Sequence, residues 1–157
     1  HAMHLAIEYR LSGTGWAECT IKDESSSCEV TASYLSDALH NLLIAATAAL
    51  SGFSQVSFRF DEEPGEYRWV ISSPRVNEIQ LEIREFDELW GSRPNEEGRL
   101  LFQTVCLPET FAKAVASAAE SVLTTHGESG YLEKWAEHPF PAKQYAVLID
   151  LLKQLER

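Results

Sequence analysis

Apolar and polar residues alternate in several short stretches of the chain, and a period of two is typical of strands with one buried face. The pattern predicts strands over residues 5–11, 16–22, 28–32, 55–60, 67–71, 78–84 and 101–105. The alternation is clearest at 78–84, where Ile79, Leu81 and Ile83 are separated by charged or amide residues. Gly13 and Gly15 supply a turn after the first stretch, so the first strands are expected to pair antiparallel.

A helical spacing replaces the alternation between the third and fourth strands. Leucine and alanine recur there at intervals of three and four from residue 35 to residue 50, which predicts a helix packed against the sheet. Ser33 or Ser36 is expected to cap its start by accepting a backbone N–H, and Gly52 to end it in a left-handed conformation.

The last third of the chain is predicted to be helical. Pro108 suits the first turn of a helix, and His126 and Gly127 are expected to stop it. Tyr131 and Trp135 lie four residues apart on one face of a short helix, and a terminal helix follows the Pro-Phe-Pro break at 139–141. Strands grouped before helices predict an α+β fold. We expect a mostly antiparallel sheet of about six strands, with one inserted helix and C-terminal helices packed on one face.

Length and charge narrow the functional classes. A chain of 157 residues suits one core. We therefore expect a single domain over 3–157, with residues 1–2 as an expression-vector remnant. With 13 Lys and Arg against 24 Asp and Glu, the net charge of −11 disfavours nucleic acid and anionic membrane surfaces. Cys19, Cys28 and Cys106 lack a pairing motif, which favours a reducing compartment and a cytoplasmic location.

The densest group of charges is a predicted hairpin loop, in which Asp61, Glu62, Glu63 and Glu66 surround a Pro-Gly turn. Paired carboxylates can divide acid and base roles, but solvated acids on a turn are commoner, so we favour binding over catalysis. No phosphate-binding glycine loop, nucleophile elbow or zinc spacing is present in the sequence. No cofactor, metal site or catalytic residue is predicted.

A second charged loop at 87–98 carries two large apolar residues, Leu89 and Trp90. Tryptophan among acids is a common composition of binding hot spots. The alternative is that Trp90 folds back on the sheet edge. His126 and His138, with Glu133 or Glu137, match no known metal-ligand spacing, so structural packing is the favoured interpretation of that region.

Three stretches carry a resemblance: SYLSDAL at 33–39, EPGEYRW at 63–69, and GESGY at 127–131 followed by Trp135 and the Pro-Phe-Pro break. Together they resemble uncharacterised bacterial proteins of similar length, and the likeness covers nearly the whole chain. It implies a bacterial cytoplasmic protein without an established activity. In composition alone, the chain is similar to the immunity proteins of polymorphic toxin systems, which are small, acidic, aromatic-rich α+β domains.

Three functional hypotheses follow. The first is a protein-interaction module, of which an immunity-type antagonist is one form, that binds and occludes a basic protein. Its expected partner-binding residues are Glu62, Glu63, Glu66, Tyr67, Trp69 and Trp90. The alternative is a small-ligand-binding protein or enzyme with a pocket between the sheet and the terminal helices, using Glu63, Arg68 and His138. The third is a structural homo-oligomer built through a sheet edge at 79–86. A monomer or small homo-oligomer is expected.

Overall fold

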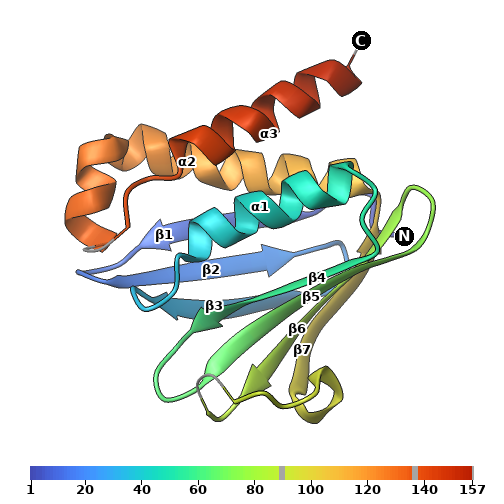
Figure 1. Ribbon diagram of the computed structural model, residues 1–157, viewed down its shortest axis with the longest axis horizontal. Helices are drawn as coiled ribbons and strands as arrows, with labels where there is room; N and C mark the ends of the chain where they lie inside the picture. Colours follow the sequence, from blue (N-terminus) through green and yellow to red (C-terminus); the bar gives the residue numbers. More distant parts are fainter. Residues whose placement is uncertain (89–90, 136–137, 157) are drawn as a thin grey trace.

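The computed structural model describes residues 1–88, 91–135 and 138–156, and the fold is α+β (Figure 1). Among these residues, seven strands form two antiparallel sheets and three α-helices cover them. The elements are β1 (Ala6–Leu11), β2 (Trp16–Lys22), β3 (Ser27–Ser33), α1 (Ala38–Leu50), β4 (Gln55–Asp61), β5 (Glu66–Arg75), β6 (Glu78–Phe86), the 3₁₀ turn η1 (Asn95–Glu97), β7 (Arg99–Cys106), α2 (Pro108–Trp135) and α3 (Ala142–Leu155).

Both sheets are meanders, in which each strand pairs with the next strand along the chain. The first has the order β1-β2-β3 and the second the order β4-β5-β6-β7. The predicted alternation decides which face is inside, since Tyr9, Cys19 and Val30 are aligned across the first sheet and all are buried. In the second sheet, Trp69 and Ile83 are paired in the same way and both are fully buried.

The strands do not form the single sheet of about six strands that the sequence predicts. Along the chain, α1 comes between β3 and β4. These two strands lie close together in space, but no hydrogen-bonded ladder joins them in the described part of the chain (Figure 1). The proposed oligomer edge at 79–86 is also wrong, because β6 pairs with β5 on one side and β7 on the other. A strand with two partners has no free edge for another chain.

The three helices lie on the same side of the two sheets in Figure 1. α2 packs against β1, α1 packs against β4, and the helices contact one another. Gly127 interrupts α2 with φ 68° and ψ 173°, which confirms the predicted stop and separates the segment carrying Tyr131 and Trp135. No helix in the described residues is long and apolar enough to cross a membrane.

The start of α1 differs from the prediction. Asp37 occupies the N-cap position, and neither Ser33 nor Ser36 caps the helix. Ser36 instead donates its hydroxyl hydrogen to the Ser33 carbonyl and accepts the backbone N–H of Asp61, with an N···O distance of 3.1 Å. Ser36 therefore connects the start of α1 to the end of β4. The predicted left-handed residue after α1 is confirmed, since Gly52 has φ 79°.

Candidate functional site

The hairpin loop between β4 and β5 holds two of its four carboxylates inside the fold. Asp61 and Glu66 are each only 1% exposed. Arg59 Nε donates to Asp61 Oδ1 at 2.9 Å, and Arg68 Nε donates to Glu66 Oε2 at 3.2 Å. Each carboxylate lies two residues from its arginine on the same strand face, so each forms an ion pair within its own strand.

Arg68 holds the loop that follows β6 through hydrogen bonds. Its guanidinium donates to the carbonyl oxygen of Arg93 at 2.6 Å and to Asn95 Oδ1 at 3.0 Å, and it lies 4.0 Å from the centre of the Phe86 ring. Arg68 alternates with the buried Trp69, so it lies on the sheet face opposite the core. Among the described residues, Arg68 makes no hydrogen bond or ion pair with Glu63 or His138, and these three residues do not form the pocket expected from the sequence.

The remaining predicted partner-binding residues divide between surface and core. Glu63 is exposed at the loop tip, and Glu62 accepts the Tyr67 hydroxyl hydrogen at 3.0 Å. Burial and then Glu62 raise the pKa of Tyr67 to about 12. Trp69 is fully buried and stacks on Phe58, with ring centres 5.5 Å apart. Trp90 lies outside the described residues.

A more exposed acidic surface covers the outer face of the first sheet, which sequence reasoning missed as a site. Arg10 lies among three glutamates, with N···O distances of 3.0 Å to Glu8, 3.5 Å to Glu18 and 3.5 Å to Glu29. The glutamate side chains are 64%, 44% and 60% exposed. Trp16 starts β2 beside them and is 38% exposed. The alternation in β1, β2 and β3 could have predicted this surface from the sequence, because every second residue of these strands around Arg10 is polar.

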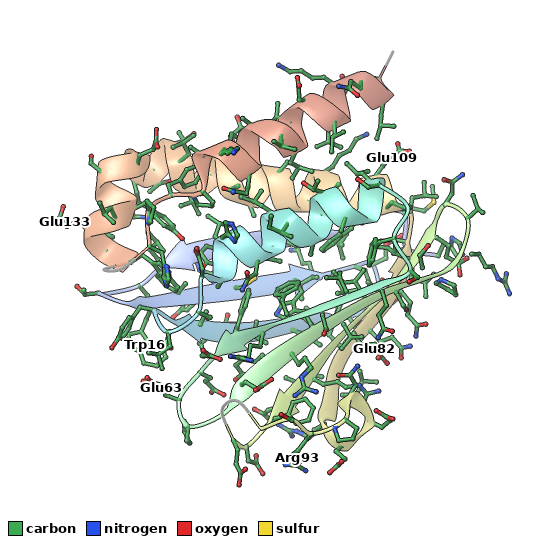
Figure 2. All side chains as sticks on the ribbon, viewed as in Figure 1. Trp16, Glu63, Glu82, Arg93, Glu109 and Glu133 are labelled. Atoms are coloured by element: carbon green, nitrogen blue, oxygen red, sulfur yellow. The ribbon has the colours of Figure 1, made fainter. Side chains whose placement is uncertain are left out.

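This surface continues to the hairpin loop. Thr31 lies opposite Glu18 across the β2–β3 ladder and near Tyr67, whose hydroxyl donates to Glu62. Trp16 and Glu63 lie toward the same side of the molecule in Figure 2. We call the continuous surface the acidic face. Its carboxylates belong to Glu8, Glu18, Glu29, Glu62, Glu63 and Glu85, and its guanidinium groups belong to Arg10 and Arg99, which pairs with Glu85.

A second constellation lies between the sheet and the helices. Asp37 Oδ2 is 3.7 Å from His138 Nδ1, and His138 Nε2 is 3.2 Å from the Tyr34 carbonyl oxygen. Burial raises the pKa of Asp37, while the positive charge of His138 and of His40 opposes this rise. Sequence reasoning favoured packing for His138, named it also as a polar group of the alternative ligand pocket, and did not consider Asp37.

Polar atoms of three aromatic residues lie in the same interior. Tyr9, Tyr131 and Trp135 are at most 4% exposed, and neither their hydroxyl oxygens nor the Trp135 Nε1 has a hydrogen-bond partner among the described protein atoms. Burial raises the pKa of both tyrosines, and the negative charge of Asp37 raises each further. We call Asp37, Tyr9, Tyr131, Trp135 and His138 the Asp37 cluster.

The described residues contain no group of three or more His, Cys, Asp or Glu side chains arranged to hold a metal ion. A surface hollow of about 570 Å³ lies between the C-terminal ends of α1 and α3 and the β5–β6 turn. It lies apart from both the acidic face and the Asp37 cluster, since it shares no lining residue with either.

Comparison with known proteins identified no similar family model, curated protein or solved structure.

Proposed function

We propose that the protein is an interaction module that binds a basic partner protein through the acidic face. The observation that supports this proposal most directly is the arrangement around Arg10, where one guanidinium group faces the carboxylates of Glu8, Glu18 and Glu29. The excess of carboxylates lies on a sheet face that the helices leave open (Figure 1). Such a face attracts cationic side chains and repels phosphate groups.

Negative charge and an exposed tryptophan favour the acidic face as the binding surface over the hairpin loop alone. Six carboxylates and two guanidinium groups make it strongly negative, which speeds encounter with a positively charged protein. Trp16 adds a large aromatic surface at its border and is 38% exposed. Tryptophan is enriched among the residues that dominate binding energy, so Trp16 takes the anchoring role that Trp69 cannot take from the core.

The proposal keeps Glu62 and Glu63 as partner-binding residues and places Glu66 and Trp69 in the supporting structure. An antagonist of the immunity type would act by covering the basic surface of its target. This mechanism requires a rigid complementary surface and no catalytic group, and the outer face of a three-stranded sheet meets that requirement.

The proposal can be tested by capture from a lysate of the source cells, using three matched proteins. The first is the wild type, the second carries Glu8→Lys, Glu18→Lys and Glu29→Lys, and the third carries Glu120→Lys, Glu128→Lys and Glu133→Lys. The last three glutamates are exposed on α2, and Figure 2 shows Glu133 in the helix layer. Both triple variants change the net charge equally. We expect the wild type and the helix variant to capture the same basic protein and the sheet variant to lose it.

The captured protein then allows a kinetic test. Its association rate with the wild type should fall steeply as salt is raised from low to physiological concentration, since charge attraction is screened over about 8 Å at 0.15 M. The sheet variant should bind more slowly with a flatter salt dependence. Equal capture by both triple variants would refute the acidic face as the binding surface.

A further inference from the structure

Asp37 occupies a position at which its side chain would ordinarily stabilise a helix. Aspartate is among the best N-cap residues because its carboxylate accepts backbone N–H groups from the first turn. In this protein the Asp37 carboxylate makes no capping hydrogen bond to α1. Oδ2 faces His138, and Oδ1 is buried without a partner among the described protein atoms. The Asp37 side chain therefore points toward His138 and the protein interior and away from the backbone N–H groups of the first turn of α1.

Trp69 Nε1 and Arg84 Nε in the second sheet also lack partners among the described protein atoms, but the Tyr9 and Tyr131 hydroxyls and Trp135 Nε1 belong to elements near this carboxylate. Tyr9 lies on β1 and Tyr131 on the last part of α2, and both are close enough for the Asp37 charge to act on them. The ring of Tyr131 lies 6.4 Å from that of Trp135 and 5.5 Å from that of Phe140. Aromatic packing thus fixes the orientation of the Tyr131 hydroxyl.

A buried polar atom without a hydrogen bond is costly, and several in one place need a common explanation. Their chemistry is complementary to a small neutral molecule. The Asp37 carboxylate accepts, the Trp135 N–H donates, and the two phenol hydroxyls can do either. A water molecule offers two donors and two acceptors, and buried water is typically held by two to four such groups.

We propose that Asp37, Tyr9 and Tyr131 bind one internal water molecule, with the Trp135 N–H as a further donor, and that this water joins β1, the start of α1 and the end of α2. The water donates to Asp37 Oδ1 and to one phenol oxygen, and it accepts from the second phenol. His138, on the solvent side of Asp37, holds the carboxylate in place through Oδ2. The site is independent of the acidic face.

Removing single hydroxyl groups tests the water. Tyr131→Phe and Tyr9→Phe each delete one water ligand and leave the ring packing intact. If the water is bound, each variant should lower Tm by about 2–4 °C, because the water loses a hydrogen bond. If the hydroxyls have no partner in solution, phenylalanine removes a buried polar group at no loss, and Tm should stay constant or rise.

Tyr145→Phe is the matched control, since Tyr145 is half-buried on α3 and its hydroxyl is not among the buried atoms without partners. Its Tm should not change. The double variant Tyr9→Phe and Tyr131→Phe should lose less than the sum of the single losses, because both hydroxyls act through one molecule.

Direct observation completes the test. A long-lived internal water gives nuclear Overhauser contacts between water and nearby protein hydrogens, and these should be present in the wild type and the Tyr145→Phe variant. They should be lost in the double variant. Unchanged or raised Tm in both single variants would overturn the proposal, and so would an organic molecule retained by the protein in native mass spectrometry and released on unfolding.

Discussion

At the scale of residues, a repeated motif is an arginine and a carboxylate two positions apart on one strand. It occurs in β1 (Glu8 and Arg10), β4 (Arg59 and Asp61), β5 (Glu66 and Arg68) and β6 (Glu82 and Arg84). In the second sheet, Arg59 is aligned with Arg68, and Arg68 with Arg84. Like charges directly opposite each other are destabilising, so the carboxylates offset a row of three arginines.

The buried pair in this row should contribute most to stability. Glu66 is 1% exposed and its partner Arg68 is 14% exposed, so Glu66→Gln leaves a guanidinium group without its charge partner in a largely dry site. We expect a loss of about 3 kcal/mol in the free energy of unfolding, the lower end for breaking a buried pair. Urea unfolding followed by circular dichroism measures it.

Glu8→Gln is the control for this prediction. It breaks the same type of pair in β1, where the glutamate is 64% exposed and the arginine 42% exposed. Exposed pairs contribute between zero and about 1 kcal/mol, so this variant should unfold close to the wild type. Equal losses in the two variants would mean that burial does not decide the strength of the motif.

At the scale of elements, Ser36 connects α1 to the second sheet, because its hydroxyl accepts the backbone N–H of Asp61. Ser36→Ala removes this buried hydrogen bond between α1 and β4 and should cost about 1 kcal/mol. Ser51→Ala, at the exposed end of α1, removes only a hydroxyl that donates to the Thr47 carbonyl and should change stability by less than about 0.5 kcal/mol. Chemical denaturation of both variants measures the difference, and a Ser36→Ala protein as stable as the wild type would contradict the prediction.

The strands were predictable from the sequence because each has one apolar face, and the alternation of Ile79, Leu81 and Ile83 is the clearest case. The division into two sheets was not, because it depends on whether the edges of β3 and β4 pair. The start of α1 was misjudged because Ser33, Ser36 and Asp37 are all good caps, and only tertiary contacts decide how each is used.

The candidate sites, too, were predictable only where they follow the alternation of a strand. The alternation that places Tyr67, Trp69 and Ile71 on one face would have assigned Trp69 to the core, and the same rule would have exposed the glutamates around Arg10. The Asp37 cluster has no such signal. Its members come from residues 9, 37, 131, 135 and 138, and only folding brings them together.

At the scale of the whole molecule, one core joins the two sheets and the helix layer. Buried residues of both sheets, α1, α2 and α3 belong to a single hydrophobic cluster, which includes Ile21, Leu81, Leu43, Val115 and Leu148. The two sheets therefore depend on the same interior, although no ladder joins them in the described residues. A shared core favours one cooperative unfolding transition.

Urea unfolding should accordingly give the same midpoint by far-UV circular dichroism and by tryptophan fluorescence. Trp69 reports on the second sheet and Trp135 on the helix layer, and both are fully buried. Each of the variants Trp69→Phe and Trp135→Phe removes one of the four tryptophans, so its difference from the wild-type signal gives the contribution of that residue. Two separated midpoints would show that the second sheet and the helix layer unfold independently.

The packing of α2 against β1 also has a consequence for synthesis on the ribosome. The chain emerges from its N-terminus, so the first sheet is complete in sequence after residue 33, whereas α2 begins only at residue 108. Until then Ile7 and Tyr9 lack the helix that shields them. The nascent chain must carry an uncovered apolar sheet while residues 34–107 are added, at about 5–20 residues per second, and its dependence on chaperones should be greatest in that interval.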